Sequence, residues 1–415
     1  MSLDVTRRSV LRIGTGAIAA VASLGPRLGL AESGDKIRIG TIQDLSSFLQ
    51  PFGTQKKRCL DLAVDEINAS GGLLGRQVEL ITYDSQSNDQ LYAQFATQLA
   101  LRDKVAVVHG GLQSSAREVI RPIFHRTNTL FFYNTPYEGG VCDRNCFCTG
   151  TTPGQLLENL LPYMIKKYGK TIYVLAADYN FGQLSEKWTR KIASENGAKV
   201  VASEFFPLDV AQFGPTISKI QAAKPAFIIN TFVGPAHASF YGQWAAAGMK
   251  NEIPIASQTF GEGGEILRMP PEVAEGITVC YNYLDEIDTA SNKVFLQRMR
   301  TKFGSDFGYI GDLGVNEYQG LLLWAEAVKK AGTLDREAVI KALESGISIV
   351  GPSGDVSLDP VTHHCIFNMY LAVAGKDRKF IIQEKFEKVR PTNPNGVCDL
   401  IKRPETNVQF QPEAL

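Results

Sequence analysis

The sequence predicts an α/β protein in which two doubly wound parallel sheets form two lobes. Three observations predict it. Short β-branched runs alternate with longer helical patterns from residue 36 onward, the alternation starts again after Pro153, and the helices after Tyr283 have no strands of their own. Those later helices would return to the first lobe, which requires more than one crossover between the lobes.

The first series alternates four strands with three helices, as is typical of a parallel sheet covered by helices on both faces. Apolar residues at helical spacing, among them Leu60, Val64 and Ile67, define its first helix, and Gly71-Gly72 ends it. The expected strands cover residues 37–42, 78–83, 105–109 and 130–133, and the expected helices cover residues 52–68, 89–101 and 114–126.

The second series supplies the second lobe. The expected helices cover residues 156–168, 181–196, 213–223 and 235–248, and the expected strands cover residues 171–176, 200–206, 226–230 and 253–256. A strand at 279–283, helices at 291–303, 314–331 and 335–345, and a strand-like tail at 350–388 complete the chain. We expect lobe 1 to comprise residues 36–150 and about 283–357, and lobe 2 to comprise about 151–282 and about 358–415.

Charge and composition exclude some partners. Lysine plus arginine and aspartate plus glutamate both number 43, so the formal net charge is zero. A balanced chain has no general electrostatic attraction to nucleic acid or to an anionic membrane. We therefore expect no nucleic-acid partner.

The N-terminus has the pattern of an export signal. Arg7 and Arg8 precede an apolar run over residues 13–24, and small residues up to Ala31 provide a cleavage site. The paired arginines resemble a twin-arginine signal over residues 1–31. A plain amphipathic helix or an uncleaved anchor is the alternative. We expect an exported protein in the periplasm, cleaved near Ala31.

Seven cysteines fit an oxidising compartment. Cys142, Cys146 and Cys148 crowd one loop, which favours a local disulfide between Cys142 and either of the other two. A zinc site would need a fourth ligand, and no histidine lies nearby in sequence. We expect neither a metal nor another cofactor.

Loops at successive strand ends are rich in glycine, hydroxyl and aromatic residues. Ligands of parallel sheets bind at the carboxyl ends of strands, beside the first turns of helices. Ser114 and Ser115 open a helix, where they either cap it or present a hydroxyl to a ligand. From these loops the expected ligand contacts are Ser114, Ser115, Tyr133, Thr135, Tyr179, Phe181, Val233, Thr259 and Glu262.

Catalytic patterns are poorly represented. Nucleophile-elbow, phosphate-loop and dinucleotide-binding patterns are missing from the sequence. The clustered histidines His363 and His364 fall on an expected tail strand, whose alternation would point them to opposite faces in a structural role. We therefore do not expect an enzyme.

One stretch resembles a known family. Phe131-Phe132-Tyr133-Asn134-Thr135-Pro136-Tyr137-Glu138-Gly139 is similar to the Tyr-Pro-x-x-Tyr-Glu-Gly stretch of urea- and short-chain-amide-binding proteins. These form a branch of the branched-chain amino-acid binding family. Gly71-Gly72-Leu73-Leu74-Gly75-Arg76 resembles the wider family's helix-end signature, and the likeness runs from about Lys36 to about Tyr318.

The resemblance implies a type I periplasmic binding protein, with a multi-strand hinge and a ligand cleft between closing lobes. It implies the solute-binding component of an ABC transporter, with a small-molecule ligand and the membrane permease as partners. In the amide branch, Ser114, Tyr133, Thr135 and Tyr179 would hold urea or a short amide. In amino-acid binders the first lobe receives the carboxylate, and Glu262 would take the ammonium.

Two residues depart from the amide branch, and two other functions stay open. Leu112 stands where the amide binder has tyrosine, and Asn134 replaces a proline. A sensor or regulator of the same fold would remain in the cytoplasm, which the export signal argues against. An amidase would release ammonia from its ligand, whereas a receptor would bind without turnover.

Overall fold

The computed structural model describes residues 35–305, 307–393 and 396–413. The export signal expected over residues 1–31 lies outside the described residues. Within these ranges no helix combines the length and the apolarity needed to cross a membrane.

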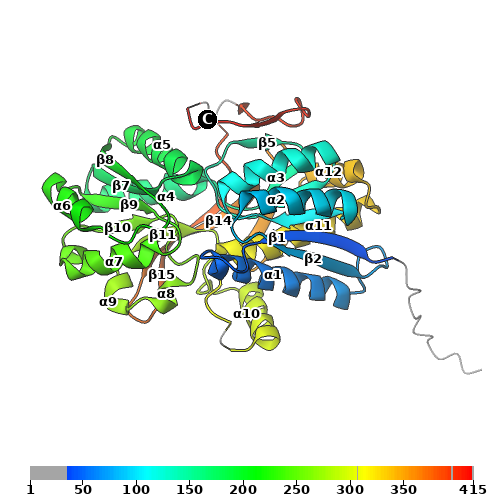
Figure 1. The fold of residues 1–415 in the computed structure, drawn as a ribbon, viewed down its shortest axis with the longest axis horizontal. Helices are drawn as coiled ribbons and strands as arrows, with labels where there is room; N and C mark the ends of the chain where they lie inside the picture. Colours follow the sequence, from blue (N-terminus) through cyan, green and yellow to red (C-terminus); the bar gives the residue numbers. More distant parts are fainter. Residues whose placement is uncertain (1–34, 306, 394–395, 414–415) are drawn as a thin grey trace, which may run out of the picture. The chain divides into compact units, whose positions relative to one another are not determined.

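The first sheet is parallel throughout and runs in the order β2-β1-β3-β4-β6. Figure 1 shows β1 and β2 side by side. Its central strands are continuous buried runs, as expected for a sheet covered on both faces. The fifth strand, β6, was expected to be a loop, because three residues are too few to produce a strand pattern. The strands are β1 (Ile37–Gln43), β2 (Val78–Asp84), β3 (Val107–Gly110), β4 (Leu130–Tyr133) and β6 (Cys146–Cys148), and the helices between them are α1 (Gln50–Ala69), α2 (Asp89–Thr97) and α3 (Ser114–Thr127).

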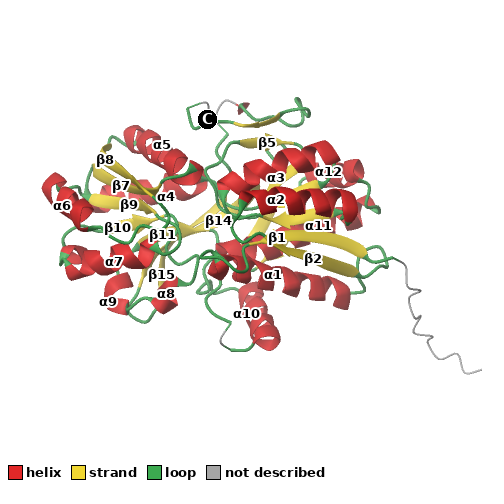
Figure 2. Ribbon diagram, in the orientation of Figure 1, coloured by secondary structure: helices red, strands yellow, loops and turns green. Residues whose placement is uncertain are grey.

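The second sheet has the order β12-β13-β14-β11-β10-β9-β7-β8, and β15 pairs with β14. Its strands up to β11 are parallel, whereas β14 pairs antiparallel to β11 (Figure 2). The strands are β7 (Thr171–Ala177), β8 (Lys199–Phe206), β9 (Phe227–Thr231), β10 (Ile255–Ser257), β11 (Thr278–Tyr281), β12 (Ser348–Gly351), β13 (Gly354–Leu358), β14 (Cys365–Ala374) and β15 (Phe380–Val389). The helices are α4 (Pro153–Tyr168), α5 (Asn180–Glu195), α6 (Gly214–Ala223), α7 (Ala236–Ala246), α8 (Glu265–Arg268) and α9 (Pro271–Ala274).

After β11 the chain returns to the first sheet. It forms α10 (Ala290–Phe303), α11 (Asp312–Ala331) and α12 (Arg336–Glu344). Helix α11 packs along α1, and the Tyr318 hydroxyl donates to Glu66 Oε2 at 2.6 Å. These helices therefore cover the first sheet although they follow the strands of the second.

The end of the chain corrects two expectations. Strand β16 (Asn407–Gln409) pairs with β5 (Val141–Asp143), so this part of the tail lies on the first lobe rather than the second. Cys142 is bonded to Cys398, 256 residues away, and the expected local disulfide to Cys146 or Cys148 is wrong. Cys146 and Cys148 point into the core from β6, whereas Cys142 faces the tail.

The two tail histidines are also placed differently. His363 and His364 precede β14, and His363 has φ 58°, so no strand alternation applies to them. His363 stacks on Phe147 at 4.3 Å, and His364 Nε2 lies 2.5 Å from the Tyr137 hydroxyl. Both imidazoles are buried, and the structural role expected of them stays a prediction.

Removing the disulfide tests the tail's placement. The Cys142→Ser, Cys398→Ser double variant should lower the free energy of unfolding by about 2–5 kcal/mol, because the bond closes a very long loop. Urea denaturation without reductant measures this change. Non-reducing peptide mapping should recover Cys142 linked to Cys398, and a peptide linking Cys142 to Cys146 or Cys148 would contradict the structure.

Candidate ligand-binding site

One cavity lies where strand ends of both sheets meet. Loops after β3 and β4 line it from the first sheet, and loops after β7, β9 and β10 line it from the second, with one residue each from α1 and α11. Its space is about 430 Å³, a volume that includes the solvent at its open mouth. The lining residues are Phe52, Leu112, Gln113, Ser114, Thr135, Pro136, Tyr179, Phe181, Val233, Thr259, Glu262 and Leu313.

The cavity brings together most of the residues singled out in the sequence, but not Ser115 or Tyr133. Ser115 turns away on α3, with its hydroxyl 3.4 Å from Asp89 Oδ1. Tyr133 is fully buried, and its hydroxyl donates to Leu112 O at 2.7 Å. The expected residues that line the cavity are Ser114, Thr135, Tyr179, Phe181, Val233, Thr259 and Glu262.

The sequence missed several apolar members of the lining. Phe52 lies in the first turn of α1 and Leu313 in the first turn of α11, so neither follows a strand. Both belong to one small apolar cluster with Leu49 and Leu112, and Val233 of the second lobe packs against it. Their proximity depends on how α11 returns to the first sheet, which no local pattern reveals.

A buried ion pair supports the first-lobe side of the cavity. Lys56 Nζ donates to Gly111 O and to Thr135 Oγ1, both at 2.6 Å, and lies 3.1 Å from Glu317 Oε1. Gln43 Nε2 donates to the same Glu317 oxygen at 3.1 Å. The Thr135 hydroxyl uses its one hydrogen to donate to Gly111 O. Towards the cavity it can therefore only accept a hydrogen bond.

Ser114 is held by a second buried carboxylate. Its hydroxyl donates to Glu138 Oε2, while Arg117 Nη2 donates to Glu138 Oε1 at 2.6 Å. The guanidinium of Arg117 lies 5.1 Å from the ring centre of Tyr133 and 4.6 Å from that of Tyr137. The position of Ser114 is thus set by a charged network beneath the cavity.

The start of α3 adds hydrogen-bond donors. The helix's own ladder begins with the Arg117 amide donating to Gln113 O, so the amides of residues 114–116 lie ahead of it. Such amides and the helix dipole favour an anionic group at this end of the helix.

The second lobe presents an acid instead. Glu262 is 8% exposed, and its Oε1 has no hydrogen-bond partner among the described residues. Burial, then the charges of Asp312 and Glu265, raises the pKa of Glu262 well above its usual range. Burial likewise raises the pKa of Asp312 to about 7. A cationic group in the cavity would stabilise the ionised Glu262.

Two open α/β sheets whose strand ends share one cavity are characteristic of proteins that enclose a small solute. The chain belongs to the periplasmic binding protein family, whose model matches residues 36–379. Its type I periplasmic-binding-protein fold is thereby confirmed.

Individual relatives share only a small part of their sequence with this chain. The leucine-, isoleucine-, valine-, threonine- and alanine-binding protein of Pseudomonas aeruginosa is 22% identical over 331 residues, covering 78% of this chain and 86% of its own. The protein of the same description from Brucella ovis, in a closed conformation, superposes with a TM-score of 0.77 at 19% identity over 86% of this chain and 97% of its own. An ABC-transporter solute-binding protein of Rhodopseudomonas palustris, in complex with 3,4-dihydroxybenzoic acid, superposes with a TM-score of 0.77 at 22% identity. The superposition covers 86% of this chain and 99% of that protein.

The raised pKa of Glu262 makes stability depend on pH. Above a pH of about 4.5, the ordinary value for glutamate, the folded protein holds a proton that the unfolded chain releases, so stability falls as pH rises towards the folded-state pKa. Glu262→Gln removes this loss and should raise the Tm of ligand-free protein at pH 8 more than at pH 5. Each pKa unit removed is worth about 1.4 kcal/mol. The exposed Glu252→Gln serves as the control; an equal gain from Glu262→Gln at both pH values would contradict the assignment.

Proposed function

We propose that the protein is the extracytoplasmic solute-binding component of an ABC transporter and that it holds one small ligand between its lobes. Family membership and the cavity at the strand ends of both sheets support this function. The protein would act only by binding its ligand more tightly in the closed state than in the open state. A ligand that contacts both lobes favours the closed state. The closed protein would then deliver its ligand to a membrane permease.

The ligand class we propose is an α-amino acid with an apolar side chain. The observation that carries it is the unpaired carboxyl of Glu262 facing the same cavity as the amino-terminal end of α3. A carboxylate would lie against the α3 amides and the ammonium against Glu262. Phe52, Leu112 and Phe181 provide apolar surface for the side chain.

The sequence favoured urea or a short amide, and the site supports this less well. A neutral amide would leave Glu262 without a cationic partner. Leu112 gives the cavity apolar surface where the amide branch has tyrosine. Asn134 does not line the cavity, because its Nδ2 donates to Thr149 Oγ1 at 2.8 Å inside the core.

Hydrolysis is favoured less than binding. Among the described residues, the cavity lining contains no cysteine or histidine, and the Ser114 hydroxyl donates to a carboxylate rather than to an imidazole. An activated nucleophile needs an adjacent base that is free to take its proton, and the Glu138 carboxylate already accepts from Arg117 and Gln409. Ser114 is therefore proposed to contact the ligand and not to attack it.

A thermal-shift screen tests the function. At 100 times its Kd, a ligand should add about 2.7 kcal/mol of stability. We expect apolar amino acids to raise the Tm, and urea, acetamide and benzoate to do so less. A shift from urea or acetamide alone would overturn the amino-acid class but keep the receptor function, whereas silence from all of them would count against both.

Variants of the two adjacent serines and of Glu262 test the site by calorimetry. Glu262→Gln should weaken amino-acid binding about 100-fold, and Ser114→Ala about tenfold, as expected for losing a charged and a neutral hydrogen bond. Ser115→Ala is the matched control, since its hydroxyl lies outside the cavity. Equal losses for Ser114→Ala and Ser115→Ala would contradict the placement.

A further inference from the structure

Residues 397–413, which we call the strap, lie beyond the part of the chain that the family model matches, which ends at residue 379. The disulfide Cys142–Cys398 and the pairing of β16 with β5 fasten the strap to the first lobe. Figure 1 shows it in red beside β5. Its contacts therefore lie outside the part of the chain that the family model matches.

The strap reaches the charged network beneath the ligand cavity. Gln409 Nε2 donates to Glu138 Oε1 at 2.7 Å and to Gly139 O at 3.0 Å. Glu138 is buried, and its other oxygen accepts from Ser114, which lines the cavity. One hydrogen-bond chain thus leads from the strap through Glu138 to the proposed ligand contact.

The backbone of the same residue also adjoins the second lobe. Trp188 Nε1 of α5 donates to the backbone oxygen of Glu138 at 2.9 Å. Next to Trp188, Lys187 Nζ lies 2.8 Å from Glu413 Oε1 of the strap. The strap and α5 therefore both contact Glu138.

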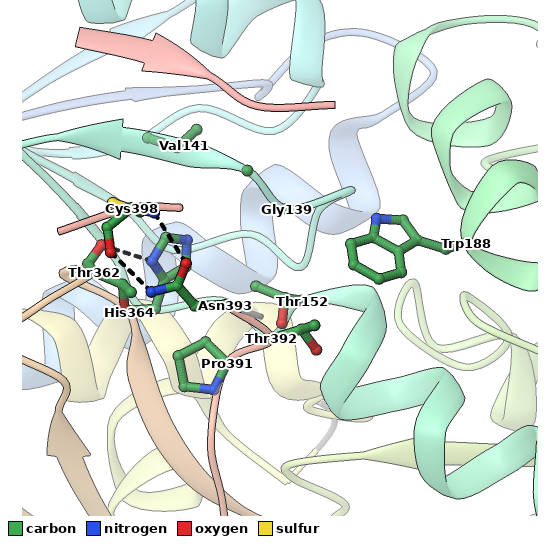
Figure 3. A pocket seen from close by; sticks show the side chains of 11 residues that line it. Gly139, Val141, Thr152, Trp188, Thr362, His364, Pro391, Thr392, Asn393 and Cys398 are labelled. Carbon is green, nitrogen blue, oxygen red and sulfur yellow. Dashed lines mark hydrogen bonds between the residues drawn. The ribbon is translucent and has the colours of Figure 1, made fainter. Parts of the chain in front are cut away.

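The strap has further contacts at its anchored end, at Cys398. A second cavity, separate from the ligand cavity, lies there, with about 360 Å³ of space counted with its mouth. Figure 3 shows that Cys398, Asn393 and His364 lie on one side of it and Trp188 on the other. Asn393 exchanges two hydrogen bonds with the backbone of Cys398, at 2.8 and 3.0 Å. These contacts hold the Cys398 end of the strap independently of Gln409.

We propose that Gln409 is a positioning residue for the ligand site. By donating to Glu138 Oε1, it holds the carboxylate in the orientation in which Oε2 fixes the Ser114 hydroxyl at the cavity. Arg117 also contacts Glu138 Oε1, but it belongs to α3 and not to the strap. We therefore do not expect Arg117 to replace the hydrogen bond from Gln409. The inference rests on the proposed function in that Ser114 is taken to contact the ligand.

Substitutions at Gln409 test the proposal through the Kd of the amino acid found in the screen. Gln409→Met keeps the length of the side chain but loses the donor, and should weaken binding about threefold to tenfold with little change in Tm. Gln383→Met, at an exposed position on β15, is the matched control and should bind like wild type. The Cys142→Ser, Cys398→Ser double variant should weaken binding in the same direction.

Gln409→Glu separates positioning from packing. At pH 8 its carboxylate would repel Glu138, so binding should be weaker than for Gln409→Met. Repulsion from Glu138 favours the protonated form of this carboxyl, so as the pH falls to 5 more of it is protonated and donates again, and the ratio of its Kd to that of wild type at the same pH should fall. A ratio that does not change with pH would overturn the positioning role.

A readout without ligand distinguishes this inference from the proposed function. In a crystal structure of ligand-free Gln409→Met, Ser114 Oγ should have left hydrogen-bonding distance of Glu138 Oε2. An unchanged Ser114–Glu138 contact would overturn the inference even if the wild-type protein binds amino acids. A displaced Ser114 in a protein that binds none would support the inference and count against the proposed function.

Discussion

The buried pair of Lys56 and Glu317 is the interaction on which the first-lobe half of the site depends. It joins α1 to α11, two helices separated by more than 200 residues. The other hydrogen bonds of the lysine go to Gly111 in the loop after β3 and to Thr135 in the loop after β4. Breaking one partner of such a pair leaves an uncompensated buried charge and costs about 3–5 kcal/mol. The pair is therefore best understood as fixing the loops after β3 and β4 at the cavity, and less as a source of net stability.

The two sides of the cavity differ in sign. The first lobe presents the start of α3, and the second presents Glu262, a buried carboxyl with an oxygen that lacks a partner among the described residues. An acid held in this way is costly in the empty protein, because its ionised form is poorly solvated. A ligand with a cation at one end and an anion at the other would contact Glu262 and the start of α3 together, which would link charge recognition to closure.

The sequence predicted the parts of the site that follow from sheet topology. Ser114, Thr135, Tyr179 and Glu262 all follow parallel strands, and the carboxyl ends of such strands share an edge. It could not tell Ser114 from Ser115, because the direction of each side chain depends on the exact first residue of α3.

Tertiary contacts were harder to foresee. Phe52 and Leu313 reach the cavity from helices whose proximity depends on the return of the chain after β11. Cys398 was assigned no partner, because a bond across 256 residues leaves no local pattern.

The most direct measurement of the central claim is the proton balance of binding, from calorimetry near pH 7 in buffers of different ionisation enthalpy. An ammonium group that forces Glu262 to ionise should release protons into the buffer; tight binding with no proton exchange would contradict the account.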